Sequence, residues 1–357
     1  MHNRSEISFA AGLPMLRFTL ATLPPLPLIA LAATQGGYWV ALALIWLTAL
    51  TATLDLLARQ TPPPRPDSEF PAANALSAVL ALGHFALLAL VIHALAGDSL
   101  TGWEKAGVFA AAGLFMGQVS NANAHELIHR SGRALHALGT AVYISLLFGH
   151  HASAHPLVHH RLVATRADPS SARRGESFYR FARRAWVGSF RMGLAAETGR
   201  LRQTGRPNWR HPYLRYVAGA ALLLAAVALL AGPAGLLAHL ALAGLAQTQL
   251  LMSDYVQHYG LTRATRPDGK PAPVGPEHSW NSPHPASSAL MLNAPRHSDH
   301  HRRPAQPYPT LDLPEAAPLL PHSLPVMACL ALSPRHWRRV MDPRAAAWET
   351  AAPLTDR

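Results

Sequence analysis

The chain has 357 residues, of which 50% are apolar and only 14% are charged, and its formal net charge is +12 at pH 7. The apolar residues occur in long blocks that a soluble core does not need, so the composition predicts an integral membrane protein. The positive charge comes from arginines between these blocks, without the interleaved aromatic residues of a nucleic-acid platform, so we interpret it as basic cytoplasmic loops and exclude nucleic-acid binding.

The first part of the chain contains four apolar segments, each near the roughly 20 residues that a spanning helix needs. The first two form a predicted hairpin that ends at a proline-rich turn, 60–67, and the next two form a hairpin around the loop 97–104. A cleaved signal peptide is the alternative for the first segment, but its length and the lack of a clear cleavage site favour a span. The predicted spans are 12–33, 37–57, 72–96 and 105–121.

Two histidines, His84 and His93, lie inside the third predicted span, and we expect both to be buried and hydrogen-bonded within the bundle. A shorter apolar segment, 134–149, separates two histidine-rich segments. If it crossed the membrane, those segments would lie on opposite faces and could not share a metal. We therefore predict a helix that packs against the bundle without crossing.

The arginine-rich segment 161–215 should stay in the cytoplasm, because basic loops are retained there. Two further spans, 214–231 and 234–252, are separated by Gly232-Pro233, and the weakly apolar segment 319–332 is interpreted as membrane-associated. The sequence thus predicts an all-α protein with a single membrane domain of about six transmembrane helices. Both termini and a histidine-rich cap lie in the cytoplasm, and the short loops indicate a bacterial inner membrane. The cytoplasmic segments are 122–213 and 253–357.

The segment His125-Glu126-Leu127-Ile128-His129 directly follows the fourth predicted span. Residues four apart share one helix face, so His125 and His129 can bind one metal ion, with Glu126 beside them. This HExxH pattern is also typical of zinc metalloproteases, and two hydrogen-bonded histidines on a helix are a further alternative.

Three more histidine clusters fall on the same predicted side of the membrane, which brings the number of candidate ligands to nine. A catalytic zinc ion uses three protein ligands, whereas two iron ions with four or five nitrogen ligands each account for nine histidines. Glu126, Asp254 and Asp299 are predicted to accept hydrogen bonds from ring N–H groups, with surface solvation as the alternative. The nine candidates are His125, His129, His155, His159, His160, His258, His297, His300 and His301.

These clusters resemble those of the membrane alkane 1-monooxygenases (alkane omega-hydroxylases), relatives of the integral-membrane fatty-acid desaturases and hydroxylases. The resemblance covers most of the chain from about Asn123 onward. Desaturases lack a His-Tyr-Gly segment such as His258-Tyr259-Gly260, which favours the hydroxylase branch. Matching segments outside the clusters are 163–165, 168–169, 171–173, 175–177, 278–282 and 340–343.

Departures from the family pattern fall beside the candidate ligands. The family usually has Glu and Gly where this chain has Ala154 and Val158, and Asn and Glu where it has Asp254 and Gln257. Every candidate ligand is retained, so these departures bear on rate and preferred substrate. Four further histidines are interpreted as non-ligands: His150, His151, His278 and His284.

The resemblance implies a non-haem di-iron monooxygenase that uses O2 to hydroxylate the terminal carbon of a medium- or long-chain alkane or similar apolar chain. Burial of methylenes must supply the binding energy, at roughly 0.8 kcal/mol each. Trp39, Trp46 and Phe115 are candidate lining residues, with interfacial anchoring or bundle packing as the alternative. Alternatives for the activity are a desaturase or a hydroxylase of another lipid and, more remotely, a membrane zinc metalloprotease or a metal transporter.

Hydroxylation with O2 needs two electrons from outside the substrate, and the sequence shows no source of them. It lacks a dinucleotide-binding Gly-x-Gly-x-x-Gly segment after a strand. Its single cysteine, Cys329, cannot build the four-thiolate site of a rubredoxin or ferredoxin, and it also excludes intrachain disulfides. The resemblance implies a separate rubredoxin, or a ferredoxin, served by an NAD(P)H-dependent reductase. The arginines of 161–215 offer such a carrier a complementary surface, or they only set topology.

Overall fold

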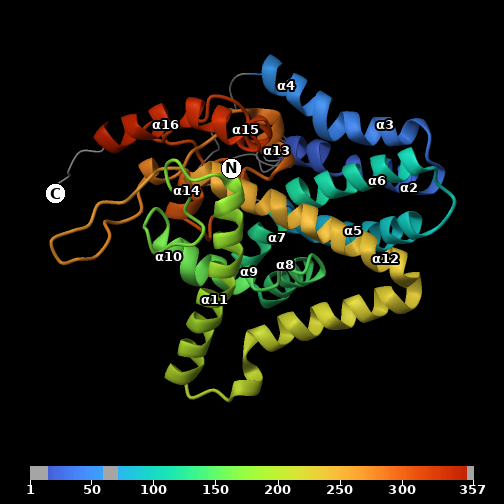
Figure 1. Ribbon diagram of the computed structural model, residues 1–357, viewed down its shortest axis with the longest axis horizontal. Coiled ribbons are helices and arrows are strands. Elements are labelled where there is room, and N and C mark those ends of the chain that lie inside the picture. Colours follow the sequence, from blue (N-terminus) through green and yellow to red (C-terminus); the bar gives the residue numbers. More distant parts are fainter. Residues whose placement is uncertain (1–14, 59–70, 352–357) are drawn as a thin grey trace, which may run out of the picture.

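The computed structural model describes residues 15–58 and 71–351, and within these ranges the regular elements are helices, apart from two isolated β-bridges. The all-α prediction is confirmed. Helices from residues 25–115 lie on the right in Figure 1, and the short helices α9 (His151–Ala154), α10 (His160–Leu162) and α14 (His297–Arg302) lie to their left. The predicted proline-rich turn 60–67 lies outside the described residues.

The first hairpin reverses at two glycines. Helix α2 (Pro25–Gln35) ends at Gly36, and α3 (Tyr38–Ile45) continues through the π-helical turn η1 (Trp46–Leu50) into α4 (Thr51–Leu57). Gly36 and Gly37 have φ of 62° and 59°, a conformation that glycine adopts without strain. The Gly37 amide donates to Glu104 Oε1 at 2.6 Å, which ties this turn to the second hairpin.

The second hairpin consists of α5 (Pro71–Ala96) and α6 (Gly102–Phe115), which runs on through η2 (Met116–Ser120) into α7 (Asn121–Ile128). His84 on α5 is buried, and its ring nitrogens lie 3.0 Å from Ser120 Oγ and 2.8 Å from Ser145 Oγ, as expected. The same expectation for His93 is wrong, because His93 is exposed. Nine residues are about two and a half helical turns, so the two rings point to opposite sides of α5.

Helix α8 (Arg133–Ser145) packs along α7. The Tyr143 hydroxyl donates to the Asn121 carbonyl at 3.2 Å, and a Cβ on Gly139 would lie only 2.6 Å from Leu127 Cβ. The glycine therefore lets the two helices approach closely. The π-helical η3 (His155–His159) then lies between α9 and α10. The predicted helix at 134–149 is present, and the histidines on either side of it meet in one place.

Helix α11 (Phe178–Gln203) is followed by η4 (Asn208–Arg210) and by α12 (Pro212–His258). Gly232 interrupts α12 with φ 65° and ψ −166°, at the Gly-Pro pair where the sequence predicts a break. Figure 1 shows the two arms of α12 folding back on each other. The second arm ends at His258, beside the short histidine-bearing helices.

The remaining elements form the cap around the histidines. They are η5 (Pro276–His278), α13 (Pro285–Leu290), α14, η6 (Tyr308–Thr310), α15 (Leu324–Ala331) and α16 (Pro334–Ala351). Asp55 Oδ1, near the end of α4, accepts from the amides of Ala286 and Ser287 at 2.8 and 3.1 Å. The bundle is thereby joined to the cap. Helix α15 has 8 residues, too few to cross a membrane.

Among the described residues, four helical stretches are long and apolar enough to cross a membrane, at 15–35, 38–57, 72–96 and 212–258. The predicted span 105–121 lies within the continuous helix α6–η2–α7, which is not one of the four. Since α12 consists of two arms, it has room for two crossings. The chain is a membrane protein, and the count of six crossings stays a prediction.

Candidate metal centre

The nine candidate histidines come together in two groups, and within each group one ring nitrogen per residue lies within 4.8 Å of the others. Across the described residues, histidines alone make up both groups, without a carboxylate or thiolate. The first group is His125, His129, His155, His160 and His300, and the second is His159, His258, His297 and His301.

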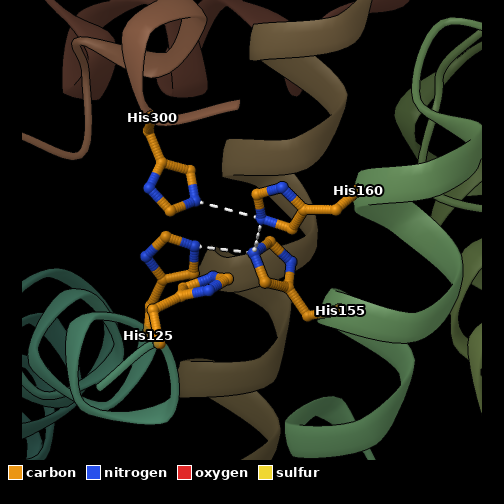
Figure 2. A group of neighbouring side chains, drawn as sticks. His125, His155, His160 and His300 are labelled. Atoms are coloured by element: carbon orange, nitrogen blue, oxygen red, sulfur yellow. Dashed lines mark hydrogen bonds between the residues drawn. The ribbon is translucent and has the colours of Figure 1, made fainter. Parts of the chain in front are cut away.

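The first group is assembled from three separate segments of the chain. Helix α7 brings His125, the η3–α10 stretch brings His155 and His160, and α14 brings His300. The Nε2 atoms of His125 and His155 lie 2.7 Å apart, those of His155 and His160 2.9 Å, and those of His160 and His300 3.2 Å. Figure 2 shows these four rings pointing toward one another. Such convergence of ring nitrogens is what binding to a common metal ion requires.

The second group lies directly beside the first, because neighbouring residues divide between them. His159 joins the second group and His160 the first, since successive residues on a helix point about 100° apart. In the same way His301 joins the second group while His300 joins the first. Within the second group, His297 Nε2 lies 3.1 Å from His301 Nε2. The rings of His160 and His301, one from each group, have centroids only 4.5 Å apart.

A buried carboxylate orients one ring of the second group. His159 Nδ1 lies 2.8 Å from Asp168 Oδ2, and Asp168 also accepts from Ser171 Oγ at 2.7 Å and from the Ser170 amide at 3.1 Å. Burial opposes charge on the imidazole, but the Asp168 carboxylate outweighs it and raises the pKa of His159. With Nδ1 held in this way, Nε2 faces the other three rings. Spacing along the sequence does not point to this role of Asp168. The resemblance to the family at residues 168–169 is the one feature of the sequence that could have indicated it.

Two of the predicted ring acceptors, Glu126 and Asp299, each bind an arginine side chain and a backbone amide instead. Glu126 contacts the Arg130 guanidinium and accepts from the Tyr308 amide at 3.1 Å. Asp299 binds the guanidinium of Arg303 through both carboxylate oxygens. Among the described residues, neither carboxylate hydrogen-bonds to a histidine ring. The reason is geometric: side chains next to a ligand on a helix point away from the metal, toward the segments that cover it.

The residues that depart from the family pattern lie around the second group. Ala154 and Val158 line a small cavity of about 10 Å³ beside His155 and His159, and Ser170 lines it as well. Asp254, the third predicted acceptor, is buried and hydrogen-bonds to Ser170.

Gln257 has a structural role, since its Nε2 donates to the Ala294 carbonyl at 3.1 Å, three residues before His297. The four further histidines lie outside both groups: His150, His151, His278 and His284.

The residues present fit bound metal ions. Burial, followed by the charge of neighbouring histidines, lowers the pKa of His155, His160 and His300 well below the ordinary value, so these rings are neutral ligands at pH 7. The Nε2 atoms of His129 and His159 are buried without a hydrogen-bond partner. Nitrogen atoms on opposite sides of a metal at about 2.1 Å lie about 4.2 Å apart, close to the spread within each group. The two groups can therefore hold one metal ion each.

Comparison with known proteins identifies the family. The Fatty acid desaturase family matches residues 101–330, which contain all nine histidines. Alkane 1-monooxygenase 2 of Pseudomonas aeruginosa is 33% identical over 253 residues, which are 70% of this chain and 67% of that protein. Alkane 1-monooxygenase 1 of Alcanivorax borkumensis is 30% identical over 336 residues, 91% of this chain and 83% of that protein. The chain belongs to the alkane 1-monooxygenase family.

Membership of the alkane 1-monooxygenase family makes the protein an oxidoreductase, and with the apolar helices and the histidine groups it supports a membrane-bound di-iron hydroxylase. The resemblance carried by the sequence motifs is thereby confirmed. A more distant relative, the xylene/toluene monooxygenase hydroxylase component XylM of Pseudomonas putida, is 28% identical over 325 residues, 88% of this chain and 85% of that protein. The relatives are thus named for alkanes and for xylene or toluene, so the test of the substrate must include both kinds of compound.

Proposed function

We propose that the protein is a di-iron monooxygenase that inserts one atom of O2 into the terminal C–H bond of a medium- or long-chain alkane or a similar apolar chain. The observation that carries this proposal is the pair of adjacent all-histidine groups, with five and four ligands. Their nine histidines outnumber the three protein ligands that a single catalytic zinc ion uses, and imidazole is a suitable ligand for iron. When bound, the two irons would supply the activation of O2 and the oxidation of the C–H bond.

The residues of the chain hold and orient this centre. Asp168 fixes the His159 ring, and three segments distant in sequence bring the first group together. Asp55 ties the end of α4 to α13, which precedes the α14 histidines. Several parts of the fold are therefore locked around the two groups, which favours a fixed ligand geometry over a transport site that must open.

An apolar chain would reach this centre from the bilayer. Binding must come from burial of methylenes, because an alkane has no polar group, at roughly 0.8 kcal/mol per methylene. Of the three predicted lining residues, Phe115 is completely buried in the bundle. Trp39 Nε1 donates to Gln35 Oε1 at 3.2 Å, and Trp46 Nε1 to the Ala21 carbonyl at 3.4 Å. Each indole is thus hydrogen-bonded within the first part of the chain, and a lining role for the two residues stays a prediction.

The electrons would come from a separate carrier, a rubredoxin or ferredoxin with its NAD(P)H-dependent reductase. This follows because the sequence has no dinucleotide-binding glycine segment and only one cysteine. The proposed location is a bacterial inner membrane, with both histidine groups and both termini on the cytoplasmic side. A zinc metalloprotease would need Glu126 free to act as a base. Its contacts with Arg130 and the Tyr308 amide favour a structural role instead.

The proposal is tested with purified protein in two measurements. Elemental analysis should find two irons per chain, whereas one zinc per chain would favour a protease. Turnover with a rubredoxin, its reductase and NADH should then convert alkanes to 1-alkanols in a panel that also contains p-xylene and free fatty acids. A preference for p-xylene would place the substrate nearer to that named for XylM, and an unsaturated fatty-acyl product would favour the desaturase alternative.

A further inference from the structure

A basic groove lies on the surface beside the stretch of chain that carries His155, His159 and His160. It has a volume of about 250 Å³ and runs between α11 and the η3–α10 stretch. The histidine-bearing stretch contributes Leu157, which lies between His155 and His159, and Arg161, which follows His160. The lining residues are Leu157, Arg161, Ala196, Gly199, Arg200 and Gln203.

The groove has a strong excess of positive charge. Its two walls, 157–166 and 196–206, together contain five arginines and one acidic residue, Glu197. Glu197 is buried, accepts from Ser153 Oγ at 2.7 Å and forms an ion pair with Arg200, whose Nη1 lies 3.6 Å from Glu197 Oε2. The Arg200 side chain is nevertheless 61% exposed, and the Arg161 guanidinium makes no hydrogen bond or ion pair with any described residue. Arg161 is therefore a free cation, and Arg200 can contact a partner on its solvent side.

The backbone of Arg161 is held in place although its side chain is free. The Arg263 guanidinium donates to the Arg161 carbonyl at 2.7 Å. A partner that binds Arg161 would therefore rest on a fixed point one residue from His160. A carrier bound there would lie close in sequence to a histidine of the first group.

We propose that this groove, which we call the arginine groove, is the docking site of a small acidic one-electron carrier protein. The inference rests on the proposed function, because hydroxylation follows RH + O2 + 2 e⁻ + 2 H⁺ → ROH + H2O and the carrier supplies the two electrons in two encounters. A carboxylate of the carrier enters between Arg161 and Arg200, and opposite charge brings the two proteins together quickly.

The groove lies on one face of α11, and exposed residues of mixed character lie on the other. Val187 and Leu194 are nine residues before Ala196 and Gln203, respectively, and therefore about 180° around the helix, and the exposed Arg191 lies between them. The face opposite the groove is therefore not a purely apolar surface for a bilayer. A protein is preferred to a lipid headgroup as the occupant because the proposed reaction needs an electron donor, and the vesicle measurement below distinguishes the two.

The test measures binding directly, so that it does not depend on turnover. The full chain is placed in nanodiscs of phosphatidylcholine, and the Kd of a rubredoxin is measured by interferometry at about 0.05 M and about 0.3 M salt. Reversal of both charges, with Arg161→Glu and Arg200→Glu, should weaken binding roughly 10-fold or more at low salt and remove most of its salt dependence. The charge-conserving pair Arg161→Lys and Arg200→Lys should stay within about 3-fold of the original Kd.

The matched control is Arg191→Glu. Arg191 is exposed on α11 nine residues before Arg200, and thus on the opposite face. It should leave the Kd unchanged. The proposal is overturned if the reversed pair binds as well as this control, or if the reversed pair loses only its association with vesicles of phosphatidylglycerol. Arg200→Gln alone, which leaves the neighbour of His160 intact, should still weaken binding about 3-fold if the double variant does not fold.

Turnover driven by dithionite separates this proposal from the proposed function. A docking variant that folds should keep dithionite-driven turnover and bound metal while it loses carrier-driven turnover. If neither reductant yields a hydroxylated product but the Kd still depends on Arg161 and Arg200, the proposed function fails and the docking site stands. If the product forms with both reductants in all variants alike, the docking site fails and the function stands.

Discussion

Replacement of Asp168 by asparagine removes the negative charge that orients the His159 ring but keeps the size of the side chain. The carboxylate accepts from the Ser171 hydroxyl at 2.7 Å and from the Ser170 amide at 3.1 Å, and it lies 2.8 Å from His159 Nδ1. An asparagine offers only one oxygen acceptor. The ring and the Ser171 hydroxyl both contact Oδ2, and the Ser170 amide donates to Oδ1, so an amide nitrogen at either position loses at least one of the three contacts.

The expected effect on metal binding follows from these contacts. A hydrogen bond to a charged group contributes about 1.5–3 kcal/mol, and a neutral one about 1 kcal/mol. The weakened hold on His159 should therefore lower the metal affinity of the second group by about 1.4–2.7 kcal/mol. This corresponds to about 10- to 100-fold, the usual range for loss of a group that supports a metal-binding histidine. The first group, which has no contact with Asp168, should bind as before.

Iron titration of the purified variant against a competing chelator is the assay. The Asp168→Asn protein should show one site of unchanged affinity and one weakened site, and hydroxylation should fall together with occupancy of the weakened site. The comparison variant is Asp299→Asn, which removes a buried carboxylate that binds Arg303 and no ring. It should lower the unfolding temperature but change iron affinity less than about 3-fold. Equal iron affinity in the two variants, or a loss confined to Asp299→Asn, would refute the role given to Asp168.

Two further predictions test the metal groups and the topology. His160→Ala and His301→Ala each remove one ligand nitrogen, so iron analysis should show less bound iron and product assays should show little activity. His336 is exposed and outside both groups, so His336→Ala should match the unmodified protein. Full iron content and full activity in the first two variants would contradict the assignment. A reporter tag near Arg202 should lie in the cytoplasm and one within 99–102 in the periplasm, as measured by alkaline phosphatase and fluorescent-protein fusions. A periplasmic signal near Arg202 would rule out the six-span arrangement.

Much of the protein is determined by local sequence, because helices and ligand faces depend on spacing along the chain. Apolar blocks predict the long helices. Gly232 and Pro233 mark the break in α12, and the interval of four residues places His125 and His129 on one face. The number of histidines in the clusters also shows how many nitrogen ligands are available to a metal centre. These properties need no knowledge of what packs against each helix.

Other properties depend on how the helices are rotated and packed, and only the tertiary structure decided them. His84 and His93 lie on the same predicted span, yet only His84 faces the bundle. The adjacent His159 and His160 belong to different metal groups because η3 and α10 lie between two sets of partners that come from α7, α12 and α14. Asp168 reaches His159 because the loop after α10 folds back on it. Contacts between distant segments determine these outcomes, and spacing within one segment carries no information about them.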